Sequence, residues 1–381
     1  MTTQRARILE PTNLTPAVEA LRNSAVVAIP TETVYGLAGN AFDATAVTKI
    51  FAAKERPSFD PLIVHVAPEL DTVEKLSAAG IVDISRMNRE MIDISNSLIN
   101  TFWPGPLTLI LPKGPKVMDL VTSGLDQVGV RMPAHPIAQD LLRAAQMPLA
   151  APSANRFGRI SPTKAEHVLE ELGDRIPYII DGGPCDVGVE STVLAIDSGI
   201  QSNTSVSVSV SVSVSVSVSV TITDTNEKPR LILLRPGKIT ASDIEHATSI
   251  SVERASSTHE KASPGMLASH YAPRKNLYII EDWSRLNASE SAPWLNKKIG
   301  LLVTSGDGQI AQQALAAIQS KPSSTVCLSA HGLDSEAAQK LFAGMRELDN
   351  SEADVILATA APNASGLWPA IADRLKRAST R

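Results

Sequence analysis

The stretch PTETVYGLAGNAFDATAVTKIFAAKERPSFDPLIVHV, residues 30–66, decides the fold predicted for this chain. Residues 25–30 form an apolar run just before it and residues 61–66 form a second one, and both runs are typical of buried strands. Between them, residues 44–51 have the apolar spacing of a helix. The stretch is therefore predicted to pass from a strand through a turn and a helix to a second buried strand.

Polar side chains gather where these two predicted strands meet loops. They are Thr31, Glu32, Thr33, Lys54, Arg56, Asp60 and His65. In open α/β sheets, ligands bind at such strand ends. A dense polar cluster between two core strands therefore indicates a binding site.

Further apolar runs predict more strands of the same sheet. They cover residues 107–112, 127–133 and 147–155 and the segments PYIIDGG and GVESTVLAID. These strands alternate with predicted helices but also follow one another closely. The predicted fold class is therefore α/β, with a twisted, mixed sheet rather than a pure Rossmann repeat. From residue 276 the strand–helix pattern restarts, which predicts a second, smaller Rossmann-like α/β domain.

These patterns also predict the domain organisation. Residues 1–248 form the first domain, residues 249–275 a polar linker that reaches the predicted site with Tyr271, and residues 276–381 the C-terminal domain. A low-complexity insert of about residues 203–226 contains eight Ser-Val pairs. Because identical repeats leave strand register unspecified, the insert is predicted to be a disordered or loosely paired ribbon at the tip of a hairpin, prone to aggregation.

The composition argues against several classes of function. At 381 residues and a net charge of −5, the chain can bury two cores but is a poor candidate for binding nucleic acid by charge alone. Cys185 and Cys327 are too few for a disulfide framework or a Cys-based zinc site. No apolar run reaches the roughly 18 residues of a membrane-spanning helix. A cytoplasmic protein without membrane contact is expected, and the N-terminus with Arg5 and Arg7 is too short to predict organelle targeting.

Hydroxyl groups and cations at or near the ends of predicted strands make up the candidate site. They are Thr31, Thr33, Lys54, Arg56, Thr122, Arg131, Ser153, Asn155, Ser161, Ser191 and Arg235. Such side chains suit an anionic, phosphate-bearing ligand, and phosphoryl or nucleotidyl transfer needs mainly positioning and charge stabilisation. Arg131 is a strong candidate, because an arginine between Val130 and Met132 in a core strand requires an anionic partner.

Several of these residues also have a structural interpretation. Lys54 and Arg56 could complement a helix dipole, and His65 could be a hydrogen-bonded core histidine. Ser153 and Asn155 could serve as turn residues.

Two further residues are interpreted as structural. Thr163 is predicted to cap a helix over residues 161–172, with Glu166 completing a capping box, and Tyr271 taken alone is a packing residue. The reaction stays open at this point, because the chain lacks a GxSxG elbow, an HExxH pair and a Walker A loop.

A series of motifs closely resembles the YrdC-like threonylcarbamoyl-AMP synthases. In chain order they are PTETVYGL, KIFAAKERP, PLIVHV, WPGPLTLIL, VGVRMPAHP, PLAAPSANRFGRISPTKAEHV, IIDGG, GVESTV and LLRPG. SPGMLASHYAP and the extra α/β unit resemble the two-domain form of that enzyme. The resemblance covers most of residues 20–200 and 230–381 and excludes the Ser-Val insert.

The resemblance implies an L-threonylcarbamoyladenylate synthase, a nucleotidyltransferase. This enzyme class condenses L-threonine, bicarbonate and ATP to threonylcarbamoyl-AMP and pyrophosphate. The product would feed the threonylcarbamoylation of the adenosine next to the anticodon of tRNA by a downstream transferase complex, with at most weak tRNA binding by the synthase itself. Mg²⁺ is expected with ATP, and the motifs specify no metal ligands.

Site residues carry over by motif position. The K-x-R and S-x-N signature matches the implied catalytic residues Lys54, Arg56, Ser153 and Asn155. The implied contacts of threonine or its carbamoyl group are Thr33, His65, Arg131, Ala151 and Ser191. The implied nucleotide contacts are Arg56, Asp60, Thr122, Ser153, Ser161, Arg235 and Tyr271. Asp60 departs from the resemblance, because relatives often carry Asn there, and a carboxylate beside a triphosphate needs Mg²⁺ or Lys54 to offset it.

Three alternatives stay open from the sequence. An RNA-binding module of the same fold, without nucleotide turnover, would show salt-sensitive RNA affinity, and the net charge of −5 weighs against it. A carbamoyl-transfer maturation factor shares the core, but its larger relatives carry Cys-rich zinc modules, which two cysteines exclude here. An enzyme disabled by the Ser-Val insert would regain activity on deletion of residues 203–226.

Overall fold

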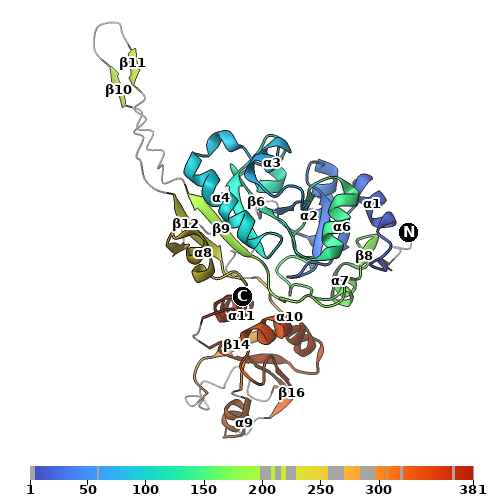
Figure 1. The fold of residues 1–381 in the computed structure, drawn as a ribbon. Coiled ribbons are helices and arrows are strands. Elements are labelled where there is room, and N and C mark those ends of the chain that lie inside the picture. Colours follow the sequence, from blue (N-terminus) through green and yellow to red (C-terminus); the bar gives the residue numbers. More distant parts are fainter. Residues whose placement is uncertain are drawn as a thin grey trace.

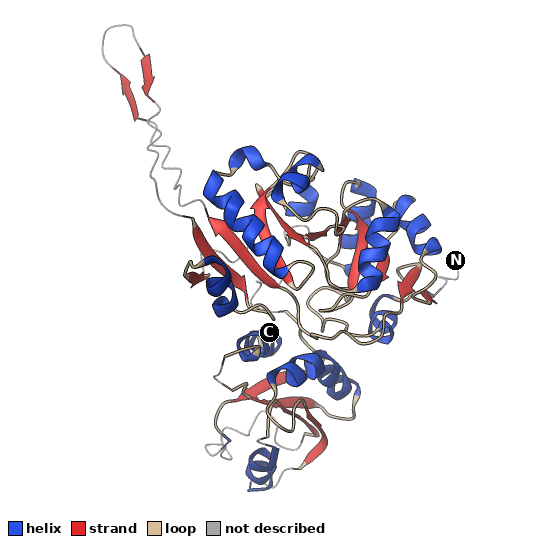
Figure 2. Cartoon of the chain, in the orientation of Figure 1, coloured by secondary structure: helices blue, strands red, loops and turns tan. Residues whose placement is uncertain are grey.

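Two sheets with helices packed on them organise the molecule (Figure 1, Figure 2). The computed structural model describes residues 5–57, 60–197, 207–210, 216–219, 229–255, 270–283, 297–306, 308–317, 321–362 and 365–380. The larger sheet belongs to the N-terminal part of the chain and the smaller one to the C-terminal part. The predicted fold class, a mixed α/β domain followed by a smaller Rossmann-like unit, is confirmed.

Eleven strands form the larger sheet, in the order β1-β8-β2-β3-β7-β4-β6-β5-β9-β12-β13. They are β1 (Arg7–Leu9), β2 (Val27–Ile29), β3 (Gly36–Asn40), β4 (Ile63–His65), β5 (Leu107–Pro112), β6 (Gln127–Arg131), β7 (Leu149–Ala150), β8 (Tyr178–Ile180), β9 (Thr192–Asp197), β12 (Arg230–Arg235) and β13 (Val252–Arg254). Strand β4 runs parallel to β6, whereas β9 runs antiparallel to β12. The sheet is therefore mixed, as predicted.

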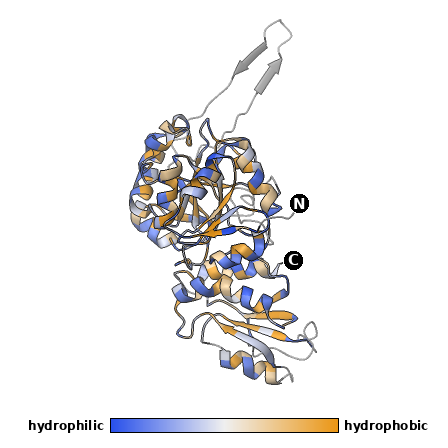
Figure 3. Ribbon diagram, turned by 90° about the vertical axis from the view of Figure 1, so that its right-hand side faces the viewer, coloured by the Kyte–Doolittle hydropathy of each residue, from blue (hydrophilic) through white to orange (hydrophobic). Residues whose placement is uncertain are grey.

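Helices pack on this sheet, and their apolar residues join those of the strands in buried clusters. Figure 3 colours each residue of the helices and strands by its hydropathy. They are α1 (Thr15–Arg22), α2 (Ala44–Lys54), α3 (Val73–Ala78), the 3-10 turn η1 (Ile84–Arg86), α4 (Arg89–Phe102), α5 (Asp119–Thr122), α6 (Pro136–Ala145), α7 (Ala165–Leu172) and α8 (Ala241–Thr248). Asp43 caps α2 and Asn88 caps α4, each accepting a bond from a backbone N–H of the first turn. Among the described residues, no helix is long and apolar enough to cross a bilayer.

The smaller sheet is parallel throughout, in the order β14-β17-β15-β16. Its strands are β14 (Asn276–Ile280), β15 (Ile299–Val303), β16 (Pro322–Cys327) and β17 (Val355–Thr359). Its helices are α9 (Gly308–Ala317), α10 (Asp334–Asn350) and α11 (Trp368–Ser379). Helices between parallel strands are the Rossmann-like arrangement expected of this unit.

The two parts of the chain share one hydrophobic cluster. Val187 and Val189 of the first part pack in it with Phe342 of α10 and Trp368 of α11. Gly188 lies between the two valines at φ +77°, and a Cβ atom there would come within 2.4 Å of the carbonyl oxygen of Ala338 in α10. Only glycine allows this close approach, which seats α10 against the first part.

Three of these strands are not predicted from the sequence. Strand β1 lies at the sheet edge, paired parallel to β8. Strand β3 has the sequence GLAGN, which has low strand propensity but is buried between β2 and β7. Strand β13 pairs parallel with β12 inside the stretch predicted as a linker, residues 249–275, so the first sheet continues past residue 248.

The predicted capping box at Thr163 is wrong. Helix α7 begins at Ala165, and its N-cap residue Lys164 makes no side-chain cap bond. The Oγ1 of Thr163 instead lies 3.4 Å from Nδ1 of His167, and the backbone N–H of Thr163 donates to the same nitrogen at 3.2 Å. Thr163 is held by the His167 ring. Lys164 is extended, with φ −146°, and the helix begins at the next residue, Ala165.

The strands that flank the Ser-Val insert pair as predicted. Strands β9 and β12 form the antiparallel hairpin, with Asp197 opposite Arg230. Within the insert, β10 (Ser207–Val210) and β11 (Val216–Ser219) pair antiparallel in a sheet of their own. The other residues of the insert lie outside the described residues.

Candidate active site

A cavity lies where the central strands of the larger sheet end. The predicted site residues that line it are Thr33, Arg56, His65, Arg131, Ala151, Ser153, Ser191, Arg235 and Tyr271. Its volume is ≈ 50 Å³, room for a few water molecules but far below the roughly 300–1,000 Å³ of a typical ligand pocket. The cavity as described is therefore narrow.

Strand pairing brings these residues together from distant parts of the chain. His65 and Arg131 are register partners at the ends of the parallel strands β4 and β6. Ser153, just past β7, forms an isolated bridge with Gly36 at the start of β3. Arg235 is the last residue of β12. The predicted meeting of side chains at strand ends is what the topology produces.

Arg131 is anchored on three sides within this cavity. An NH2 atom lies 2.6 Å from Oε1 of Glu32, NH1 donates to Oγ1 of Thr33 at 3.0 Å, and Nε donates to the carbonyl of Gly105 at 3.3 Å. Glu32 is thus the anionic partner that an arginine in a core strand requires. Gly105 is fixed by the WPGP turn, where a Cβ atom would lie 2.1 Å from the carbonyl oxygen of Phe102.

His65 is a neutral imidazole beside this arginine. Burial, reinforced by the charge of Arg131, lowers the pKa of His65 to about 3. Its Nδ1 atom has no hydrogen-bond partner among the residues that the structure describes. A buried core histidine normally has such a partner, so the unpaired nitrogen favours a site residue over the structural interpretation.

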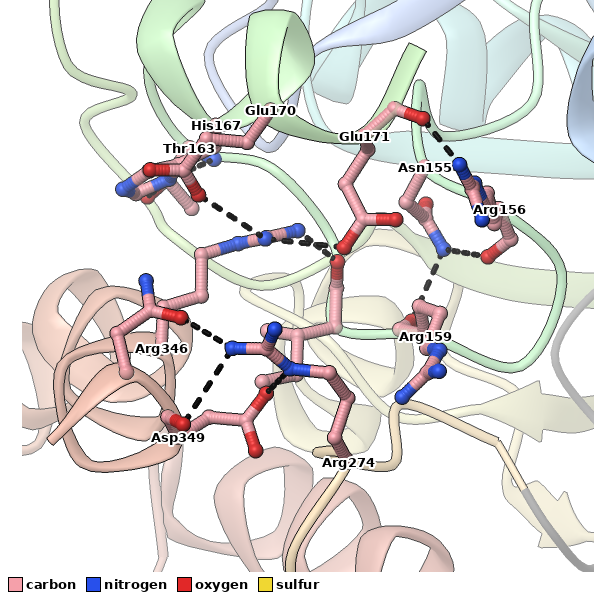
Figure 4. Close-up of polar contacts among 12 residues, drawn as sticks. Asn155, Arg156, Arg159, Thr163, His167, Glu170, Glu171, Arg274, Arg346 and Asp349 are labelled. Atoms are coloured by element: carbon pink, nitrogen blue, oxygen red, sulfur yellow. Dashed lines mark hydrogen bonds and ion pairs between the residues drawn. The ribbon is translucent and has the colours of Figure 1, made fainter. Parts of the chain in front are cut away.

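Lys54 and Asn155 do not line the cavity but contact the loop that carries Ser153. The Nζ atom of buried Lys54 donates to the carbonyl oxygens of Ser153 and Asn155, the latter at 2.6 Å. The Asn155 side chain donates to the carbonyls of Arg156 and Arg159, at 2.7 and 2.9 Å (Figure 4). Burial, reinforced by Arg56, holds the pKa of Lys54 well below its usual value. In the described conformation both residues hold the loop that carries Ser153.

Asp60 and Arg56 form a buried ion pair at the cavity wall. NH2 of Arg56 lies 2.8 Å from Oδ2 of Asp60, and Arg56 also donates to the carbonyl oxygens of Asp60 and Pro61. Burial raises the pKa of Asp60, and the Arg56 charge opposes that shift. The negative charge of Asp60 is therefore offset mainly by Arg56 and to a smaller extent by Lys54.

Ser191 and Arg235 are locked to each other at the next strand ends. Arg235 donates from Nε to the carbonyl and from NH2 to the hydroxyl of Ser191, both at 3.0 Å. The Ser191 hydroxyl also lies 2.8 Å from Oγ1 of Thr108 on β5. This arrangement holds the buried guanidinium group of Arg235 in the cavity wall.

Glu190 lines the cavity but was not among the predicted site residues. Its Oε1 accepts from the Ser161 hydroxyl at 2.6 Å, and its Oε2 accepts from Nε of Arg374 at 3.0 Å. Ser161 itself does not line the cavity, and neither does Thr122, whose hydroxyl donates to the carbonyl of Leu125. The motif GVESTV contains Glu190, so a carboxylate beside Ser191 was a usable signal.

Tyr271 closes the cavity from the connection between the two parts. Its ring contacts His270 at 4.1 Å and Phe342 at 5.5 Å between centroids, and its backbone is left-handed, with φ +63°. Burial raises the pKa of Tyr271 to about 12, and its hydroxyl has no hydrogen-bond partner within the described part of the chain. A strained tyrosine with an unpaired hydroxyl in a cavity is available to a ligand.

The described residues offer no protein cage for a metal ion. They contain no group of three or more His, Cys, Asp or Glu side chains placed to hold one. The buried carboxylates at the site, Glu32, Asp60 and Glu190, each pair with an arginine. Within the described part of the chain, these paired carboxylates therefore specify no metal site of their own.

Comparison with known proteins identifies the family of the chain. Residues 19–204 match the Sua5_yciO_yrdC family model, described as telomere recombination, and residues 239–380 match the model of the threonylcarbamoyl-AMP synthase C-terminal domain. The threonylcarbamoyl-AMP synthase of Bacillus subtilis is 37% identical over 95% of this chain and 92% of its own length. That of Pyrococcus abyssi is 36% identical over 94% of this chain and 92% of its own length.

The chain belongs to the threonylcarbamoyl-AMP synthase family. It has the two-domain Sua5 form of that family, because both family models match in order. The crystal structure of P. abyssi Sua5 complexed with L-threonine superposes with a TM-score of 0.76 at 32% identity, covering 98% of each chain. The fold is thus that of the threonylcarbamoyl-AMP synthases.

Proposed function

We propose that this chain is an L-threonylcarbamoyladenylate synthase, a nucleotidyltransferase that condenses L-threonine, bicarbonate and ATP to threonylcarbamoyl-AMP and pyrophosphate. The observation that carries the proposal is one cavity lined by Arg56, Arg131, Ser153, Ser191 and Arg235 in a member of this family. These residues supply charge and hydrogen bonds without a nucleophile. That inventory suits transfer of a nucleotidyl group, which depends on positioning and electrostatics.

The threonine side of the site is proposed to be the pair of strand ends β4 and β6. Arg131 would bind the threonine carboxylate, sharing its charge with Glu32, and Thr33 would fix the guanidinium by its existing bond. Neutral His65 can accept a hydrogen bond at Nδ1, beside the amine. Ala151 and Ser191 would border the side chain and the carbamoyl group.

The nucleotide side is proposed to be the wall formed by Arg56, Ser153, Arg235 and Tyr271. Three further predicted nucleotide contacts do not line the cavity: Asp60, Thr122 and Ser161. Lys54 and Asn155 would act by holding the loop that presents Ser153. Mg²⁺ bound together with ATP would supply further positive charge beside Arg56 and Arg235.

The proposed reaction has two steps. The threonine amine attacks the carbon of bicarbonate, which gives a carbamate and water, or that of CO₂, which gives a carbamate and a proton released to solvent. A carbamate oxygen then attacks the α-phosphorus of ATP, the bond to the β-phosphate breaks, and pyrophosphate leaves. Arg56 and Arg235 would stabilise the charge that builds on the phosphates.

Tyr271 is proposed to be the lid of this site. A carbamate decomposes in water, so the cavity must close before the second step. With ≈ 50 Å³ free, the cavity is too narrow for ATP, and the lining residues His270 and Tyr271 are proposed to move to admit it.

Pyrophosphate release from ATP tests the function. The assay is run with all substrates and then with threonine and bicarbonate omitted in turn. Release that depends on both supports the synthase, with the product handed to a downstream tRNA-modifying transferase. ATP hydrolysis indifferent to threonine, or salt-sensitive RNA binding without turnover, would replace the proposal.

A further inference from the structure

Each buried carboxylate at the active site is matched to one arginine. Glu32 pairs with Arg131 at 2.6 Å, and Asp60 pairs with Arg56 at 2.8 Å. Both pairs lie within the first domain. The third carboxylate, Glu190, lines the cavity and pairs with an arginine from the last helix of the second domain.

That arginine, Arg374 of α11, is fully buried. Its Nε donates to Oε2 of Glu190 at 3.0 Å, and its NH1 donates to the carbonyl of Pro236 at 2.8 Å and lies 3.1 Å from Asp373. Its guanidinium carbon also lies 5.7 Å from the centre of the Tyr271 ring. Arg374 thus touches Glu190 and Tyr271, which both line the cavity, and Pro236, which follows Arg235.

The position of Glu190 makes its charge a problem for an anionic ligand. Glu190 lines the same cavity as Arg235 and Tyr271, so its carboxylate lies beside the proposed nucleotide wall. An uncompensated carboxylate in a buried site repels phosphate strongly, because little solvent screens it. Pairing with Arg374 cancels that charge, and the bond from Ser161 holds the other oxygen.

We propose that Arg374 is a positioning residue of the active site, by which the second domain neutralises Glu190 and so permits ATP to bind. The proposal rests on the proposed function, and it makes the site a composite of both domains. Arg374 touches no substrate; it acts through Glu190 and through the ring of Tyr271. The threonine side, formed by β4 and β6, does not depend on it.

The test compares Arg374→Met with the double variant Arg374→Met/Glu190→Gln. Methionine keeps the length of the side chain and removes its charge. We expect Arg374→Met to raise the KM for ATP at least about tenfold, with little change in the KM for threonine. Removing the Glu190 charge in the double variant should recover much of the lost ATP affinity, because the repulsion is then gone.

Arg346 of α10 provides the matched control (Figure 4). It is also buried and crosses between the domains, since it donates to the carbonyl of Ile160 and pairs with Glu171 at 3.1 Å. Neither partner lines the cavity. Arg346→Met should therefore lower the thermal midpoint without the selective loss of ATP affinity. Arg374→Lys, which keeps the charge, should lose less ATP affinity than Arg374→Met.

ATP binding to each folded variant is also measured by calorimetry with Mg²⁺ and no threonine, so that the result does not depend on turnover. If Glu190→Gln fails to rescue Arg374→Met, or if Arg346→Met raises the KM for ATP equally, Arg374 is only a domain fastener and the proposal is overturned. If the unmodified protein releases no threonine-dependent pyrophosphate, the proposed function fails instead, and the two failures are distinct.

Discussion

Individual residues of this site divide into those whose environment the sequence predicts and those it does not. Arg131 in a core strand requires an anion, and the sequence predicts this requirement without naming the partner. The structure supplies Glu32, which stands in the same motif as Thr33. Glu190 could be noticed in GVESTV, but Arg374 looks like an ordinary basic residue of a surface helix. Its partner lies 184 positions away in the sequence, and only tertiary packing makes that contact visible.

Replacing Arg131 with Gln should impair threonine use selectively. The change removes a charge-assisted contact, so we expect the KM for threonine to rise roughly 100-fold while the KM for ATP changes little. Steady-state pyrophosphate release with varied threonine measures it. Arg143→Gln, at an exposed arginine of α6 that pairs with Glu69, is the control and should match the unmodified protein. Unchanged threonine-dependent release in Arg131→Gln would contradict the carboxylate role.

His65 should make the fold sensitive to acid. Its pKa is about 3 in the folded protein against 6.5 for an exposed imidazole, so the unfolded chain binds the proton first as the pH falls. Its contribution to stability is complete above pH 6.5 and is lost toward pH 3, by about 2 kcal/mol at pH 5. Urea unfolding at pH 7 and pH 5 should show a smaller loss in His65→Asn. An equal loss in both proteins would exclude this assignment.

At the scale of elements, strands and helices follow from apolar patterning where that patterning is strong. The largely apolar runs that become β5, β6 and β9 are predicted. Strand β3 is composed of Gly, Leu, Ala and Asn, and burial between two neighbours rather than propensity makes it a strand. The capping box at Thr163 fails for the opposite reason, because a local signal loses to a contact with His167.

Gly188 tests the seating of α10. Alanine there would meet the Ala338 carbonyl at 2.4 Å and would strain a backbone at φ +77°, so we expect Gly188→Ala to lower the stability by about 2–4 kcal/mol. Gly183 is the matched control on the same loop, since its φ is +74° but nothing lies within 4 Å of a Cβ atom. Thermal unfolding should show a much smaller shift for Gly183→Ala. Equal shifts would mean that backbone strain alone, and not the domain contact, sets the cost.

At the scale of the whole molecule, the predicted division into two α/β units agrees with two separate sheets, but their relation could not be predicted. A hydrophobic cluster spans both, and Arg346 and Arg374 both bridge them. Such contacts have no sequence signature, because each side alone resembles an ordinary amphipathic surface. The second unit lacks catalytic motifs of its own. It contacts the residues around the cavity through the shared hydrophobic cluster and the ion pair between Arg374 and Glu190.

Deleting residues 203–226 should leave catalysis intact. The insert joins β9 and β12 at the end marked by Asp197 and Arg230, whereas Ser191 and Arg235 lie at the other end. We expect the deletion variant to keep kcat and both KM values within about twofold, since additivity holds for distant sites. Its solubility should rise, because repeated Ser-Val pairs favour β aggregation. A deletion variant with markedly higher kcat would mean that the insert inhibits the enzyme.

The placement of the insert at the far end of the β9–β12 hairpin has a genetic consequence. Six-residue strands keep the junction with the insert roughly 20 Å from Ser191 and Arg235. A tandem repeat in a gene gains and loses units by replication slippage, two codons at a time, without shifting the reading frame. Such changes would enter the protein only at the remote tip. The number of Ser-Val units can then change between lineages without affecting activity. Differences in that number would then reflect ancestry rather than function.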